Sequence, residues 1–136
     1  MMIRDAKPED EKWVGAIFKK ADHILGKGFF GTIWWRYWNQ GTPSEFWIVI
    51  PDIAFAHYKV RKDGVRALYE IAVEEGHKRQ GYGKALLRHI GFPMELKTDA
   101  NHEESNRFYK ACGFYPAGEK RSRDGTKRLR IWVCAQ

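Results

Sequence analysis

A basic, glycine-containing turn at residues 77–87 carries the clearest chemical signal in this sequence. It reads His-Lys-Arg-Gln-Gly-Tyr-Gly-Lys-Ala-Leu-Leu, and an apolar helical pattern begins directly after it. A strand-like segment at residues 68–73 precedes the turn. This order favours phosphate binding, because backbone N–H groups point at the anion, the helix start is positive, and glycine permits a close approach. The turn therefore predicts a site for a phosphate-bearing ligand.

Two familiar phosphate-binding motifs do not account for this turn. The sequence lacks the GxxxxGK[ST] phosphate loop, and a GxGxxG pattern starting at Gly81 is not completed because residue 86 is leucine. The turn alone leaves the ligand open, so the rest of the chain must indicate which one binds.

Composition predicts a globular protein with one domain over residues 1–136. Apolar residues make up 43% of the chain and charged residues 30%, which is typical of a folded chain rather than a disordered one. The net charge of +7 suggests an anionic partner, which could be a phosphate cofactor, nucleic acid or an acidic protein. A solubilising surface charge is the alternative interpretation.

The sequence predicts a cytoplasmic protein without a membrane segment or a metal site. No signal peptide is visible at the N-terminus, and the most apolar stretch, at residues 46–50, is far too short to cross a bilayer. Cys112 and Cys134 form neither a metal-ligand spacing nor a disulfide framework.

The hydrophobic pattern predicts the elements that must position the turn. We expect strands at residues 2–4, 45–50, 53–60, 65–73 and 94–98, a hairpin at 121–133 turning at Asp124-Gly125, and helices that start at Pro8, at 32–38, after the glycine turn to Ile90, and at 103–112. The three central strands form an antiparallel meander. Alternation predicts that Val65, Ala67, Tyr69, Ile71 and Val73 share one face of their strand, with Arg66, Leu68, Glu70 and Ala72 on the other.

This order of elements, together with two motifs, resembles the GNAT superfamily of N-acetyltransferases. The strand at residues 69–73 leads into Lys78-Arg79-Gln80-Gly81-Tyr82-Gly83, which is similar to the family's acyl-CoA pyrophosphate loop. Residues 105–114, Ser-Asn-Arg-Phe-Tyr-Lys-Ala-Cys-Gly-Phe, resemble its second motif. The resemblance implies an α/β (mixed α+β) fold, with a central, mostly antiparallel mixed sheet of six to seven strands flanked by about four helices.

The resemblance also implies acetyl-CoA as cofactor and a set of residues that bind it. These are Ile71, Ala72 and Val73 along the strand, Lys78, Arg79, Gln80, Gly81, Tyr82, Gly83 and Lys84 in the turn, and Asn101 and Ser105 near the second motif. Two positions depart from the family pattern. Lys78 stands where arginine or glutamine is usual, and His102 holds a place commonly taken by asparagine, with Asn101 just before it.

The implied chemistry is direct acetyl transfer from a thioester to a primary amine within a ternary complex. Tyr109 is the candidate acid for the thiolate leaving group, because a phenol with a pKa near 10 can protonate a thiolate held beside it. Glu70 is the candidate general base, or the carboxylate that positions the amine. Core packing for Tyr109 and a surface ion pair for Glu70 are the competing interpretations, and His57 is expected only to pack along its strand.

The acceptor amine stays open at this point. An aromatic cluster lies where the family builds its acceptor site, or it forms part of the core: Phe29, Phe30, Trp34, Trp35, Tyr37 and Trp38. The alternative function is a catalytically silent, CoA-binding module whose basic surface binds nucleic acid or an acidic protein. The cations of that surface are Lys120, Arg121, Arg123, Lys127, Arg128 and Arg130. A homodimer formed through edge strands is compatible with either function.

Overall fold

A seven-stranded sheet organises the computed structural model, which describes residues 2–21 and 45–135. The strands are β1 (Arg4–Asp5), β2 (Glu45–Ile50), β3 (Ala54–Val60), β4 (Arg66–Val73), β5 (Met94–Asp99), β6 (Tyr115–Arg121) and β7 (Arg128–Cys134). Their order across the sheet is β1-β2-β3-β4-β5-β7-β6. Among the strand pairs within the described residues, only β4–β5 is parallel. The expected mixed, mostly antiparallel sheet is confirmed.

Three described helices accompany the sheet: α1 (Glu11–Lys20), α4 (Tyr82–Ile90) and α5 (Glu103–Ala111). Short 3-10 turns at Pro8–Asp10 and Glu75–His77 precede α1 and α4. The helix expected at residues 32–38 and the glycine-rich loop before it lie outside the described residues. No described helix has the length and apolar character needed to cross a membrane.

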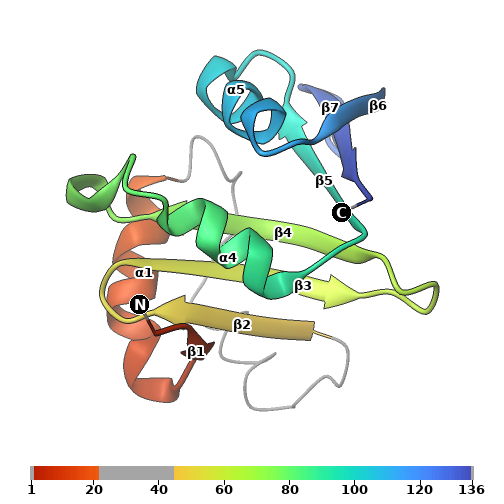
Figure 1. Cartoon of the computed structure of the whole chain (residues 1–136). Helices are drawn as coiled ribbons and strands as arrows, with labels where there is room; N and C mark the ends of the chain where they lie inside the picture. The colour runs from red at the N-terminus through yellow and green to blue at the C-terminus, as the bar shows by residue number, and fades with distance from the viewer. Residues whose placement is uncertain (1, 22–44, 136) are drawn as a thin grey trace.

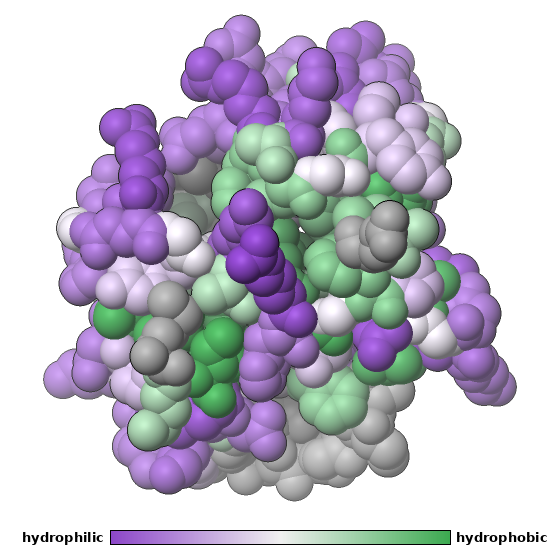
Figure 2. Space-filling view, in the orientation of Figure 1, coloured by the Kyte–Doolittle hydropathy of each residue, from purple (hydrophilic) through white to green (hydrophobic). Residues whose placement is uncertain are grey.

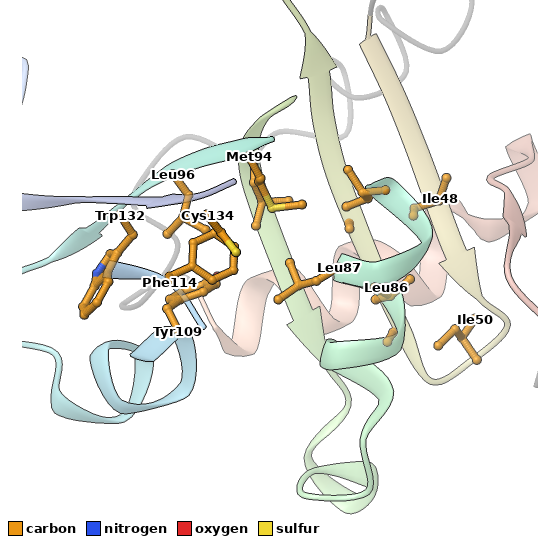
Figure 3. Packing of buried hydrophobic residues seen from close by; sticks show 14 residues of the cluster. Ile48, Ile50, Leu86, Leu87, Met94, Leu96, Tyr109, Phe114, Trp132 and Cys134 are labelled. Atoms are coloured by element: carbon orange, nitrogen blue, oxygen red, sulfur yellow. The ribbon is translucent and has the colours of Figure 1, made fainter. Parts of the chain in front are cut away.

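The two sheet faces carry separate apolar clusters, one beneath α4 and one beneath α1. Figure 1 shows these two helices in front of the sheet and behind it. On one face, Leu86 and Leu87 of α4 pack over Ile48 and Ile50, and this cluster continues to Tyr109, Phe114 and Trp132 (Figure 3). On the other face, α1 packs through Val14, Ile17 and Phe18 onto Trp47, Val49, Phe55 and Ala72. Helices α1 and α4 therefore lie on opposite sides of the sheet.

A β-bulge in β4 corrects the predicted faces of that strand. His57 pairs with Glu70 and the next residue, Tyr58, pairs with Leu68, so Tyr69 is the extra residue. A bulge opposes two residues to one and shifts the alternation on either side of it. Leu68 consequently packs with the α4-side cluster, whereas Glu70 and Tyr69 both contact His57. The expectation that Leu68 shares a face with Glu70, and that Tyr69 lies opposite Glu70, is wrong.

The same strand separates from β5 at the bulge. Parallel pairing runs from Arg66↔Met94 to Leu68↔Leu96, and no described pair joins the two strands beyond it. The C-terminal halves of β4 and β5 diverge, and β5 turns away with β7 and β6 (Figure 1). Residues 69–73 thus keep β3 as a neighbour on one edge and face an opening on the other.

Two predicted boundaries differ from the structure. The hairpin extends from Tyr115 rather than Arg121, and Pro116, Gly118 and an irregular register explain why its first strand has a weak pattern. The first strand is Arg4–Asp5 rather than residues 2–4. The predicted turn at Asp124-Gly125 is confirmed, with Gly125 at φ 74° and three hydrogen bonds accepted by Asp124 Oδ1.

Asp10 fixes the start of α1 against the sheet. Its carboxylate, 3% exposed, accepts hydrogen bonds from Arg4 Nη1 (2.7 Å), the Lys7 backbone N–H (2.7 Å) and Trp13 Nε1 (2.9 Å). Burial raises the pKa of Asp10, but the hydrogen bonds from Arg4, Trp13 and Lys7 outweigh it, so the pKa lies below its ordinary value. The ionised form therefore stabilises the folded state.

We expect Asp10→Asn to lower the free energy of unfolding by about 1–3 kcal/mol at pH 7, because a charged acceptor with buried donors is lost. A lowered carboxyl pKa stabilises the fold above the unfolded value of about 3.9, and the effect disappears as the pH falls through the folded pKa. The difference in the free energy of unfolding between wild type and variant should therefore shrink below about pH 4, and urea denaturation at several pH values measures it. Glu9→Gln, at an exposed neighbouring position, is the control.

Candidate active site

A cleft of about 1100 Å³ opens where β4 and β5 separate. Its lining comes from residues 68–75 of β4 and the following turn, residues 96–99 of β5, and side chains of α1, α4 and α5. Figure 2 shows apolar side chains gathered in the middle of one face, with hydrophilic side chains projecting around them. The sequence therefore brings its two motifs, at residues 69–83 and 105–114, to a common cavity.

The glycine turn forms one end of the cleft. Gly81, at φ 87°, is the N-cap of α4, and no side chain caps this helix. The first intrahelical backbone bond runs from Ala85 N–H to Gly81 O, so the N–H groups of residues 82–84 lack intrahelical acceptors. These groups and the helix dipole favour an anion at this position. Arg79, at φ 63°, adds a second left-handed residue to the turn.

Most of the predicted cofactor-binding residues line this cleft. They are Ile71, Ala72, Val73, Lys78, Arg79, Gly81, Tyr82, Gly83, Lys84 and Ser105. Gln80 is exposed in the turn but is not part of the lining, and the same is true of Asn101, whose N–H donates to Asp99 Oδ1. Lys78 pairs with Glu75 at 3.1 Å and lies 3.9 Å from Glu104. An anion at the turn would compete with these carboxylates for Lys78.

Tyr109 lies at the inner wall of the cleft, on the α4 side of the sheet. It is 6% exposed and packs edge-on against Phe108. It packs in the same way against Phe114, which lies beside it in Figure 3. Burial raises the pKa of Tyr109 well above its ordinary value, with Cys112 as a smaller contribution. The phenol is therefore protonated at neutral pH, as a proton donor must be, although the same burial fits the core interpretation.

Glu70 lines the cleft from the α1 side. Its Oε2 lies 2.6 Å from Nδ1 of His57, and Nε2 of His57 lies 3.4 Å from Oε1 of Glu45. The three residues form a carboxylate–imidazole–carboxylate row across β2, β3 and β4. The expectation that Glu70 forms an ion pair is compatible with this row. The sequence alone gives His57 no such partners, because these contacts depend on strand register and on the bulge.

A polar network holds the end of β5 beside α5. Thr98 Oγ1 donates to Asn106 Oδ1 at 2.6 Å, and Trp132 Nε1 donates to Thr98 Oγ1 at 3.0 Å. The Asn106 amide also donates to the carbonyl groups of Asp99 and Ala100. His102 caps α5 by accepting from the Ser105 N–H. Asn106 is a residue that sequence reasoning missed, and its place inside the second motif is the available signal.

The expected acceptor cluster of aromatic residues at 29–38 lies outside the described residues. The cations expected on the C-terminal hairpin lie on or beside β6 and β7, where Arg128 and Arg130 approach Glu119 at 3.4 and 4.0 Å. None of these six cations is part of the cleft lining, although Arg130 pairs in register with Thr98, which is.

The fold combines a cleft between two separating parallel strands with a helix start that no side chain caps, an arrangement that favours an anionic ligand. A sequence model described as the acetyltransferase (GNAT) domain matches residues 42–116, more than half of the chain. The chain therefore belongs to the GNAT family of acetyltransferases. A comparison with curated protein sequences gives no match.

Solved structures share the fold at low sequence identity. The ribosomal-protein-S18-alanine N-acetyltransferase of Escherichia coli is 23% identical with a TM-score of 0.75, covering 98% of this chain and 92% of its own. A spermidine N-acetyltransferase from Vibrio cholerae is 12% identical with a TM-score of 0.78 and coverage of 99% and 95%. An aminoglycoside 6'-N-acetyltransferase complexed with coenzyme A is 14% identical with a TM-score of 0.76 and coverage of 99% and 97%.

Gly83 permits close packing between α4 and α5 beneath the turn. A Cβ at this position would lie 3.1 Å from Cζ of Phe108. We expect Gly83→Ala to lower the free energy of unfolding by about 1 kcal/mol, since overpacking outweighs the gain in helix propensity. Gly76→Ala is a matched control, because its Cβ meets Glu74 Oε2, the end of a flexible side chain, at the same 3.1 Å. Equal thermal stability of the two variants would contradict the packing argument.

Proposed function

We propose that this protein transfers an acetyl group from acetyl-CoA to a primary amine within the cleft between β4 and β5. The observation that carries the proposal is the arrangement around the strand separation. An uncapped helix start lies at one end, and Glu70 and Tyr109 line the cleft from opposite faces of the sheet. Anion binding and proton transfer are thereby available in one cavity.

The donor would bind along the turn and the open edge of β4. Backbone N–H groups of residues 82–84 would receive the pyrophosphate, with Lys78, Arg79 and Lys84 adding positive charge. Alternate backbone groups of residues 69–73 point toward the opening, because β5 no longer pairs with them. An extended amide-containing arm can form hydrogen bonds with such an edge, as an added strand does. Coenzyme A supplies an arm of this kind with the thioester at its end.

The acceptor amine would be deprotonated at Glu70. An ammonium cannot attack a carbonyl, so its proton must first leave, and Glu70 is a partly exposed carboxylate on the cleft wall. The neutral amine then attacks the thioester carbon, the C–S bond breaks, and the departing thiolate takes a proton from an acid, which is restored by the proton that the new amide nitrogen loses. Tyr109 is the proposed donor for that last step, because it lines the cleft; the burial that raises its pKa keeps the phenol protonated and also makes it a weaker acid than an exposed tyrosine.

A covalent acetyl-enzyme is disfavoured at the cysteine nearest to this machinery. Burial raises the pKa of Cys112, which lowers its thiolate fraction at neutral pH. Cys112 also packs against the apolar cluster that contains Tyr109. Direct transfer in a ternary complex is therefore the proposed route.

The proposal is tested by following thiol release from acetyl-CoA in the presence of three amines. A peptide with an N-terminal alanine, spermidine and an aminoglycoside represent the acceptors named for structurally similar enzymes. We expect CoA to raise the melting temperature and at least one amine to be acetylated. Absence of any thermal shift would reject the donor site. A shift without turnover would favour the CoA-binding module with its basic hairpin.

Tyr109→Phe separates proton donation from packing. Removing only the hydroxyl should lower kcat by about 100-fold or more, the usual loss when a general acid is removed. The KM for acetyl-CoA and the melting temperature should stay near wild type, because the ring still fills the same space. Phe108→Leu is the packing control: we expect it to lower the melting temperature more than kcat. An unchanged kcat in Tyr109→Phe would remove Tyr109 from the acid role.

A further inference from the structure

We propose that His57 is a positioning residue for the acetyl transfer, holding the Glu70 carboxylate toward the cleft while Glu45 holds the far side of the imidazole ring. This inference rests on the proposed role of Glu70. It assigns a function to two residues, His57 and Glu45, that do not line the cleft themselves.

The three side chains of the row come from adjacent strands of the sheet and are mostly buried. Side-chain exposure rises from 7% at His57 and 13% at Glu45 to 23% at Glu70, so only the Glu70 end approaches solvent. The contact between Nδ1 and Glu70 Oε2 is 2.6 Å, the length of a strong, charge-assisted hydrogen bond. The Glu45 contact, at 3.4 Å, is a looser electrostatic one.

Two aromatic rings contact the imidazole ring. The indole of Trp47 stacks on it with centroids 4.2 Å apart and planes 7° from parallel. The Tyr69 ring, supplied by the bulge, lies 5.0 Å away at 47°. His57 and Glu70 are also register partners in β3 and β4. The ring therefore offers a rigid N–H donor to a carboxylate side chain that otherwise has several free torsions.

Such a fixed donor matters for a base that must meet an incoming amine. Misplacing a reacting group by about 1 Å can lower the rate roughly 100-fold. A donor that holds the Glu70 carboxylate in one orientation would therefore preserve the rate. Within the row, Glu70 alone lines the cleft, so it is the member that an incoming amine can reach. Lys59 lies opposite Glu45 in the strand register, and the α1 residues packed on this face, Val14, Ile17 and Phe18, are apolar. Lys20 of α1 and Lys97 of β5 also line the cleft.

The competing explanation is that His57 only ties β3 to β4. Two substitutions of nearly equal size distinguish the two roles. In His57→Asn, the amide nitrogen stands close to the place of Nδ1 and can still donate to Glu70. In His57→Leu, the same space is filled without a donor. A purely structural role predicts similar kinetics for two folded variants, whereas positioning predicts different ones.

We expect His57→Leu to lower kcat by about 10- to 100-fold without changing the KM for acetyl-CoA. His57→Asn should recover most of kcat, and Glu45→Gln should have an intermediate effect. The acceptor is whichever of the alanine peptide, spermidine or the aminoglycoside is acetylated, and melting temperatures confirm folding. Equal kcat values for the asparagine and leucine variants, or wild-type kcat in His57→Leu, would overturn the positioning role.

A second measurement does not depend on turnover. In protein labelled with 15N-histidine, the Nδ1–H held against Glu70 should give a ring N–H resonance protected from exchange with water. Glu70→Ala should abolish it, and Glu45→Gln should leave it. If that resonance is absent from the wild type, the positioning role is rejected even where acetyl transfer is observed. If it is present in a protein that acetylates none of the amines, the proposed function fails while the contact stands.

Discussion

The functional geometry depends on the single extra residue, Tyr69, that β4 carries relative to β3. Because Tyr58 pairs with Leu68 and His57 with Glu70, the side-chain alternation shifts at this point. Leu68 enters the α4-side core, and Glu70 turns to the α1 side beside His57. The parallel pairing with β5 ends at the same place, at Leu68↔Leu96. A regular β4 would have continued that ladder and closed the edge that the cleft now exposes.

Sequence patterns predicted the parts of this structure that depend on residues close together in the sequence. The glycine turn, the strand before it and α5 with its Gly113 stop follow from local spacing, and their ranges agree closely with the structure. Local spacing could not show that the two motifs serve one site. The resemblance to the family implied this, because it assigned residues of both motifs to the same cofactor. The faces of β4 were mispredicted because a bulge has no local signature here: no glycine or proline marks residues 69–70. The roles of Glu45 and His57 were missed for a related reason, since they depend on pairing across three strands.

The two ends of the cleft differ in the charged residues that line them. The turn carries Lys78, Arg79 and Lys84, together with the positive end of α4. The opposite wall carries Glu70, backed by His57 and Glu45. In the proposed reaction, the polyanionic donor would bind at the basic turn and the amine would approach Glu70. Lys78 lies 3.1 Å from Glu75 and 3.9 Å from Glu104, so these carboxylates partly offset the positive charge of the turn.

In the proposed reaction, the two substrates would approach from opposite faces of the sheet. Tyr109 belongs to the cluster beneath α4, whereas Glu70 lies on the α1 face with Trp47 and His57. In an unbroken sheet these two side chains could not act on the same atoms, because strands joined by a hydrogen-bonded ladder would separate them. The opening beyond Leu68 and Leu96 removes that barrier over a short stretch. An amine approaching from the α1 side and a thioester lying along the α4 side would meet within it, with the base and the acid already on the correct faces.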